Sequence, residues 1–233
     1  LIETWMRSCP VEGMKVYRQE LEGRTPLLVA EIDPYGPEAP VAAPTTVLYG
    51  HLDKQPPMEG WKPGLGPWTP VVMNERLYGR GGADDGYAAY ASLAAIEAVQ
   101  AHGGSHRRCF GLIECSEESG SPDLPAYVDH LADRIGSLGL VVCLDSFCGD
   151  YERMWTTTSL RGLLSATLRV EVLHEGVHSG SASGVVPDSF RIARRLLDRI
   201  EDPDTGRVLL QDLWAEVPTG REAEIEAVAE DLG

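Results

Sequence analysis

Several features are missing from this sequence of 233 residues, and each absence excludes a class of protein. No apolar run approaches the roughly 18 residues that a membrane-spanning helix needs. No cluster of lysine and arginine is large enough to neutralise the phosphates of nucleic acid, and a formal net charge of −16 opposes such binding. No internal repeat or low-complexity tract is present. We therefore expect a globular protein with no membrane partner and no nucleic-acid partner.

Cysteine is also scarce. The five residues are far apart, without a close CxxC pair: Cys9, Cys109, Cys115, Cys143 and Cys148. An odd number of scattered cysteines does not predict a disulfide framework. We expect reduced, mostly buried thiols and a cytoplasmic protein, and no targeting segment is visible.

Strand and helix signals alternate through the first two thirds of the sequence. Strands are predicted at 14–22, 26–32, 45–50, 108–114 and 138–144, a hairpin at 71–78, and helices at 85–101 and 124–135. This order predicts an α/β fold, with a mostly parallel, doubly wound sheet and helices on both faces. The runs at 45–50 and 138–144 are apolar throughout, which is typical of buried strands.

The pattern changes after Trp155. Residues 160–174 alternate as one long strand, 187–200 form an amphipathic helix and 221–232 a polar helix. We expect a first domain over residues 1–158, with part of it missing at its C-terminal side. Residues 159–233 would be the start of a smaller α+β domain.

Acidic and imidazole side chains stand where the predicted strands end. They are His51 and Asp53, Asp84 and Asp85, Glu117 and Glu118, and Asp145. In doubly wound sheets ligands collect at the carboxyl ends of the strands, so these residues should share one crevice. One imidazole with several carboxylates suits zinc, manganese or cobalt. Two ions about 3.5–4 Å apart would need a bridging carboxylate, and the set predicts a two-metal hydrolase site.

Each cluster also has a plain structural explanation. His51 could ligate a metal while Asp53 accepts its other ring N–H, or it could be a strand-end histidine bonded to its neighbour. Helix capping could explain Asp84 or Asp85, but it explains only one of the two well. The paired glutamates could be a solvated helix start, and Asp145 could be a turn residue.

In this order the clusters resemble the dinuclear metallopeptidase family that includes carnosinase, cytosolic nonspecific dipeptidase, aminoacylase, acetylornithine deacetylase and succinyl-diaminopimelate desuccinylase. The matching stretches are residues 49–53, 77–85, 117–121, Asp145 and residues 177–180. The resemblance runs over nearly all of residues 10–200, and the Glu-Glu-Ser-Gly-Ser stretch places the dipeptidase branch closest. It implies a zinc-exopeptidase-like catalytic domain over 1–158 and the start of a lid and dimerisation domain over 159–233.

The resemblance also implies two divalent metal ions, zinc first, with manganese or cobalt as alternatives. His51 and Asp145 would bind one ion and Glu118 the other, with Asp84 bridging both. The family's second ion takes a further histidine from a C-terminal segment, and no histidine follows His178. We therefore expect this chain to be part of a longer enzyme, and the truncated chain could be inactive.

The remaining roles implied by the resemblance concern proton transfer and the substrate. Glu117 would be the general base for a metal-activated water, with Asp53 beside it in the catalytic set. His178, from the lid, would stabilise the oxyanion. In several dimeric relatives this histidine reaches the partner subunit's site, so we expect a homodimer formed through the lid domain. One departure is Gly86-Tyr87, where family members commonly carry Lys-Gly.

The predicted function is hydrolysis of the peptide bond of dipeptides or small peptides by a cytoplasmic metallopeptidase of the exopeptidase type. Two alternatives stay open. The same site could act on N-acyl amino acids as a deacylase, because the residues that recognise substrate in this family lie largely in the lid. A truncated chain could instead be a non-catalytic metal-binding or dimerisation module.

Overall fold

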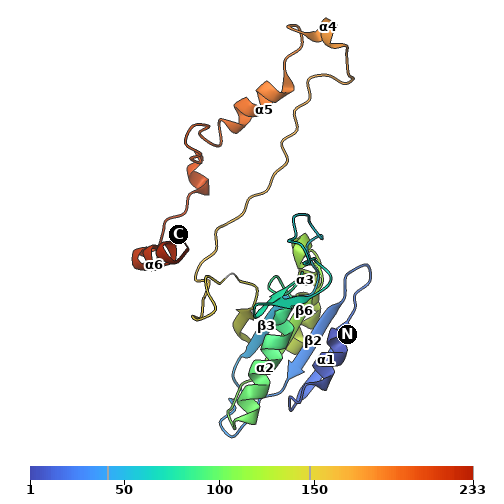
Figure 1. The fold of residues 1–233 in the computed structure, drawn as a ribbon, viewed down its shortest axis with the longest axis vertical. Coiled ribbons are helices and arrows are strands. Elements are labelled where there is room, and N and C mark those ends of the chain that lie inside the picture. The colour runs from blue at the N-terminus through green and yellow to red at the C-terminus, as the bar shows by residue number, and fades with distance from the viewer. Residues whose placement is uncertain (41, 147, 233) are drawn as a thin grey trace. The chain divides into compact units, whose positions relative to one another are not determined.

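The structure, a computed structural model, describes residues 1–40, 42–146 and 148–232. The chain divides into two units, Leu1–Cys148 and Gly149–Gly233. The first unit is built around one sheet and the second consists of short helices joined by extended segments (Figure 1). Among the described residues, none of the helices combines the length and the apolar content that crossing a bilayer requires.

A five-stranded sheet forms the centre of the first unit. Its strands are β1 (Met14–Gln19), β2 (Leu27–Ile32), β3 (Thr45–His51), β6 (Cys109–Glu114) and β7 (Leu138–Cys143), in the order β1-β2-β6-β3-β7. β2 runs antiparallel to both of its neighbours, whereas β3 runs parallel to β6 and to β7. Four of the five strands, all except β2, therefore run in the same direction, and the sheet is mixed but mostly parallel, as predicted. Because β3, β6 and β7 are parallel neighbours, their carboxyl ends lie side by side at the same end of the sheet.

Helices cover both faces of this sheet. α1 (Ile2–Ser8) and α2 (Tyr87–Ala101) pack on one face, and α3 (Leu124–Ile135) packs on the other (Figure 1). A hydrophobic core lies on each face of the sheet. β6 contributes side chains to both cores, because successive side chains of a strand point to opposite faces. Ile113 joins the core under α2, whereas Phe110 and Leu112 join the core under α3. This two-sided burial explains why every residue of β6 is buried.

Two short elements occur in the segments that follow the carboxyl ends of β3 and β6. The hairpin of β4 (Val71–Met73) and β5 (Arg76–Tyr78) turns through Asn74 and Glu75, which both have positive φ angles, of 52° and 61°. Positive φ at both turn residues is the geometry that matches the twist of a two-residue hairpin. The 3₁₀ turn η1 (Glu117–Ser119) follows β6 directly.

β7 differs from the buried strand that its apolar sequence predicted. It stands at the sheet edge, and Leu138, Leu140 and Val141 are 54%, 53% and 46% exposed. An apolar run fits a strand with neighbours on both sides, but in the described part of the chain only β3 pairs with it. The prediction of mostly buried thiols is also wrong: all five cysteines are free, and only Cys109 is buried.

The second unit contains α4 (Ser179–Ala182), α5 (Ser189–Leu197), the 3₁₀ turn η2 (Gln211–Leu213) and α6 (Glu222–Leu232). The helices predicted at 187–200 and 221–232 are confirmed. The strand predicted at 160–174 is wrong, because the described residues of this unit form no strand. Alternation alone makes no strand when no neighbouring strand is present to share hydrogen bonds. No side chain described between residues 149 and 231 is buried.

Candidate metal centre

His51 is the last residue of β3, and its side chain is fully buried at the carboxyl end of the strand. Its Nδ1 lies 3.2 Å from the main-chain oxygen and 3.3 Å from the carboxylate of Asp53. Its Nε2 is buried without a hydrogen-bond partner in the described structure. A buried polar nitrogen left in this way calls for a physical explanation.

Three carboxylate oxygens surround this nitrogen. Asp84 Oδ1 lies 3.4 Å from His51 Nε2, Asp145 Oδ2 lies 3.5 Å away and Glu117 Oε2 lies 3.7 Å away. Ligand atoms of His51, Asp84 and Asp145 all lie within 4.8 Å of one another. Two ligand atoms each about 2.1 Å from a tetrahedral zinc ion are about 3.4 Å apart. These residues therefore fit a divalent ion, and the mixed N/O donor set suits zinc, manganese or cobalt.

The two neighbouring aspartates have different surroundings. Asp85 is buried, and its carboxylate accepts the backbone N–H groups of His51, at 2.9 Å, and of Ala88, at 3.2 Å. It therefore secures the start of α2 to the end of β3. Asp84 is 61% exposed and directs its carboxylate toward His51 Nε2. Bonding to the start of α2 thus explains the carboxylate of Asp85, whereas the carboxylate of Asp84 faces the candidate metal site.

Asp53 connects the end of β3 to η1. Besides facing the His51 ring, its carboxylate accepts the backbone N–H groups of Glu117, at 3.2 Å, and of Glu118, at 2.9 Å. The Glu118 carboxylate accepts the backbone N–H of Gln55, at 3.0 Å, and also the side-chain amide of Gln55. Glu117 thus points toward His51, whereas Glu118 is held by Gln55 and stands outside the group formed by His51, Asp84 and Asp145.

Glu114 is a buried carboxylate that the sequence did not single out. It accepts three hydroxyl groups, from Tyr49 at 2.6 Å, Ser116 at 3.0 Å and Ser121 at 2.8 Å. These bonds tie both ends of η1 to the last residue of β6, where Ser121 adopts a positive φ of 51°. The only sequence signal was an acidic residue at the end of an apolar strand, in a segment that also contains Ser116 and Ser121.

The crowding of acidic groups shifts the pKa values in this cluster. Burial lowers the pKa of His51, but the carboxylates of Asp145, Glu117, Asp85 and Asp53 outweigh it and raise that pKa above its ordinary value. Burial also raises the pKa of Glu117 and of Asp145, and neighbouring carboxylates add to this while His51 opposes it. The site concentrates negative charge in a partly buried place, and a cation would relieve this repulsion.

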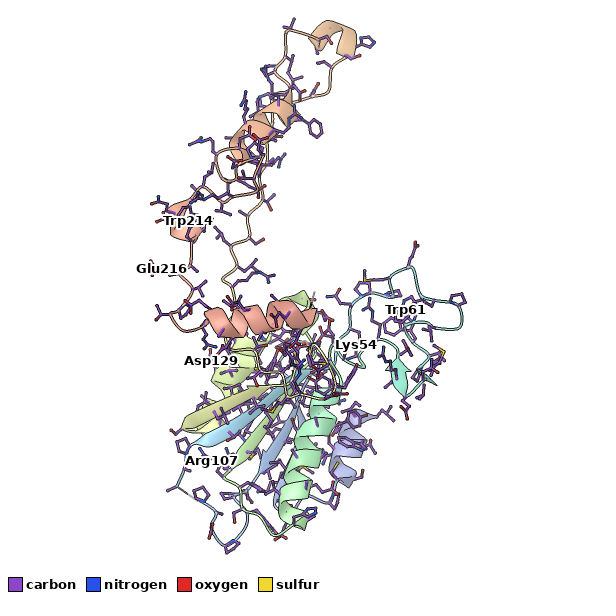
Figure 2. All side chains as sticks on the ribbon, turned by 60° about the vertical axis from the view of Figure 1, so that its left-hand side comes forward. Lys54, Trp61, Arg107, Asp129, Trp214 and Glu216 are labelled. Atoms are coloured by element: carbon purple, nitrogen blue, oxygen red, sulfur yellow. The ribbon has the colours of Figure 1, made fainter. Side chains whose placement is uncertain are left out.

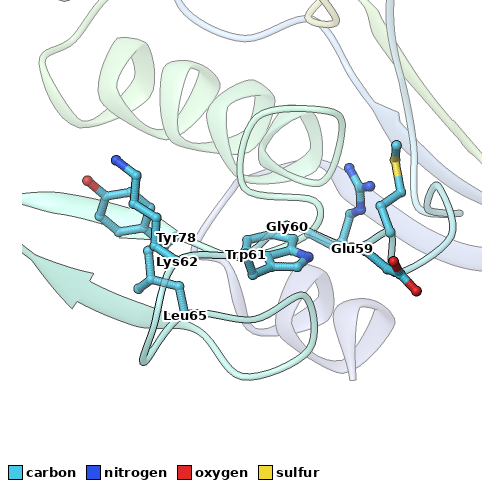
Figure 3. A pocket seen from close by; sticks show the side chains of 8 residues that line it. Glu59, Gly60, Trp61, Lys62, Leu65 and Tyr78 are labelled. Atoms are coloured by element: carbon cyan, nitrogen blue, oxygen red, sulfur yellow. The ribbon is translucent and has the colours of Figure 1, made fainter.

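Two other places need mention. His178 lies in the second unit, where its Nδ1 accepts the backbone N–H of Gly180 at 3.1 Å at the start of α4. The two units are each described by themselves, so a role for His178 at this site stays a prediction. A pocket of about 370 Å³ between the 58–65 loop, Tyr78 and Arg80 contains none of the predicted site residues (Figure 3).

The family described as "Peptidase family M20/M25/M40" matches residues 47–189. That range is more than half of the chain and contains every predicted site residue. The chain belongs to this peptidase family, which confirms the resemblance.

Individual relatives agree with this assignment. The chain is 31% identical over 201 residues to the cysteinylglycine-S-conjugate dipeptidase of Corynebacterium striatum, covering 80% of this chain and 42% of the relative. It is 27% identical over 203 residues to the beta-Ala-His dipeptidase of Mus musculus, covering 85% and 40%. The chain thus spans about two fifths of the length of these relatives.

A solved structure supports the fold. The M20 family metallo-carboxypeptidase of Sulfolobus solfataricus superimposes with a TM-score of 0.64 at 21% identity, covering 98% of this chain and 50% of the other. At this level of identity the likeness concerns the fold alone.

Proposed function

We propose that this protein is a metal-dependent hydrolase that cleaves the peptide bond of dipeptides or small peptides, with zinc held by His51, Asp84 and Asp145. The observation that carries the proposal is the buried His51 Nε2, which lacks a hydrogen bond and faces three carboxylate oxygens at 3.4–3.7 Å. Gathering three carboxylates around a buried imidazole without a cation is unfavourable, since each carboxylate repels the others.

A second ion is proposed next to the first, with Asp84 shared between the two and Glu118 as a further ligand. The exposure of Asp84 supports this, because a carboxylate has a second oxygen to offer. Glu118 would have to exchange its bonds to Gln55 for the ion. When bound, divalent ions lower the pKa of water to about 7 and polarise a carbonyl group.

Glu117 is the proposed general base. Its carboxylate faces the same point as His51 Nε2 while remaining partly open to substrate, and its backbone is fixed by Asp53. It would take a proton from the attacking water and return it to the leaving amine.

Asp53 is proposed to orient His51. An N–H at Nδ1 directed to the oxygens of Asp53 leaves Nε2 unprotonated and free to bind metal. His178 is proposed as an oxyanion donor from a lid that also forms a homodimer, supported by the match of residues 177–180 to the family motif. Dipeptides are the proposed substrates because both relatives named above are dipeptidases.

The test uses the purified 233-residue protein and its Glu117→Gln variant. We expect hydrolysis of Cys-Gly or β-Ala-His, loss of that activity with a chelator, and recovery with zinc. Glu117→Gln should keep its metal content by elemental mass spectrometry and lose about 10²–10⁴-fold in rate. Glu75→Gln, in the exposed hairpin turn, is the matched control and should be unchanged.

Three results would contradict the proposal: activity that resists chelation, an unchanged rate in Glu117→Gln, or the absence of bound metal. N-acetyl amino acids in the same substrate panel separate peptidase from deacylase. Faster turnover of these than of any dipeptide would move the assignment to the deacylase alternative while keeping the site.

A further inference from the structure

β3 ends at His51, and shortly after it residues 53–55 make contacts in two directions. Asp53 and Gln55 bond to η1, as described above. Lys54, between them, bonds instead to the loop of residues 79–86, which carries Asp84. This alternation is what an extended segment produces, because successive side chains point to opposite sides. Figure 2 labels Lys54 between the sheet and the loop that carries Trp61.

The 79–86 loop is shaped to admit the lysine side chain. Gly81 has a φ of 75°, and a Cβ there would overlap the stem of Lys54, with Cδ and Nζ only 2.8 Å away. A Cβ at Gly86 would lie 3.4 Å from Lys54 Nζ and 2.6 Å from the Gly81 carbonyl oxygen. Two glycines therefore leave the channel through which the lysine reaches the loop backbone.

The end of this channel is next to the proposed metal ligand. Lys54 Nζ donates to the backbone oxygen of Asp85, while the carboxylate of Asp85 accepts the backbone N–H of His51. Asp85 is thus tied to the end of β3 from both its main chain and its side chain. Asp84, the preceding residue, has no regular secondary structure of its own. Its carboxylate lies 3.4 Å from His51 Nε2, one residue away from these ties in the chain.

We infer that Lys54 is a positioning residue for Asp84: it fastens the 79–86 loop to the end of β3 and so sets the separation of Asp84 from His51. The inference rests on the proposed metal centre. The direction in which metal affinity changes when the lysine is removed distinguishes this positioning role from a simple electrostatic effect. Removing a nearby positive charge should tighten the binding of a cation, because a repulsion disappears. Removing a positioning residue should weaken binding, as loss of the groups behind metal ligands does by about 10–100-fold.

The first test is Lys54→Met, which keeps the stem and removes the ammonium. We expect zinc to bind about 10-fold more weakly or worse, measured by competition with a chelating dye on the full 233-residue protein. Lys62→Met, at an exposed loop lysine, is the control and should bind as the wild type does. Unchanged or tighter binding in Lys54→Met would overturn the inference. If thermal melts with excess chelator show that Lys54→Met is unfolded, Lys54→Gln takes its place.

The second test asks whether Lys54 acts through Asp84 in particular. Lys54→Met is combined with Asp84→Asn and, separately, with Asp145→Asn. Once Asp84→Asn has removed the ligand, the lysine change should have little further effect on zinc affinity, whereas its full effect should persist in Asp145→Asn. The same loss in both backgrounds would mean a general loosening and would overturn the inference. If neither Asp84→Asn nor Asp145→Asn weakens zinc binding, the proposed metal centre itself is wrong.

Discussion

Two amphipathic helices, one in each unit, have similar sequence patterns and opposite surroundings. α3 in the first unit buries Tyr127, Leu131 and Ile135 against the sheet. α5 in the second unit has no buried residue, and its Phe190 is 75% exposed. Both helices have an aspartate at the N-cap position. Asp188 accepts backbone N–H groups from the first turn of α5, whereas Asp123 makes no capping bond to α3 and accepts hydrogen bonds from Thr25 instead.

The difference lies in what the rest of the chain supplies. The surface under α3 comes from β2 and β3, which are far from it in sequence, and from β6, which shortly precedes it. The described residues of the second unit supply no such surface to α5. An isolated helix shorter than about 12–15 residues is marginal in water. Amphipathicity therefore predicts where a helix forms, whereas its stability depends on a second apolar surface that the pattern does not specify.

The largest expected effect of this difference is on amide hydrogen exchange. Amides of β6 should exchange about 10³-fold or more slowly than those of residues 160–171, because β6 opens only with the core while residues 160–171 have no regular structure. Exchange followed by mass spectrometry on peptides from both regions checks this. Protection of residues 160–174 that grows with protein concentration would break the comparison, and it would favour pairing between two copies.

A matched pair of phenylalanines gives the next largest effect. Phe110 in β6 is fully buried, whereas Phe190 in α5 is mostly exposed. We expect Phe110→Ala to lower the free energy of unfolding by about 3–5 kcal/mol. Phe190→Ala should change it by no more than about 0.5 kcal/mol. Urea unfolding followed by tryptophan fluorescence measures both. A large loss in Phe190→Ala would show that α5 is covered by a surface that the described residues do not include.

In the first unit, the sequence predicted the secondary structure well for segments with a regular pattern of apolar residues. The alternation and apolar runs gave β2, β3, β6 and α3 close to their observed bounds, because each of these segments finds its partner within the chain. The strand β7 was predicted correctly, but its predicted burial and the strand predicted at 160–174 were wrong for the opposite reason. Their patterns produce apolar surfaces that need a packing partner, and the described residues leave most of these side chains exposed.

The site was predictable in composition and less so in detail. Strand ends placed His51, Asp84 and Asp145 together, as the topology of a parallel sheet requires. Sequence could not decide which of Asp84 and Asp85 faces the site, because that choice depends on the backbone N–H groups that Asp85 reaches. It also missed Lys54 and Gln55, whose partners lie in other loops and become visible only with side-chain directions.

Acid titration provides a finer comparison through two aspartates. Asp123 accepts the backbone N–H and hydroxyl of Thr25 and the guanidinium of Arg24, and these bonds lower its pKa below the ordinary value. Asp150 accepts the backbone N–H of Arg153 and its guanidinium, and the backbone N–H of Glu152, which lower its pKa to about 2. The partners of Asp123 are about a hundred residues away, whereas those of Asp150 are within three.

A carboxyl group whose pKa is lowered by folding stabilises the protein above its unfolded pKa of about 3.9, and this contribution is lost as the pH falls through the folded pKa. We therefore expect Asp123→Ala to lower the urea midpoint of the first unit at pH 6, with the difference from wild type shrinking below about pH 4. Asp150→Ala should leave that midpoint unchanged at every pH, because its bonds join neighbours in a unit where none of the residues described from 149 to 231 is buried. A pH-dependent shift in Asp150→Ala would mean that the two units unfold together, and the contrast between α3 and α5 would then reflect one cooperative structure.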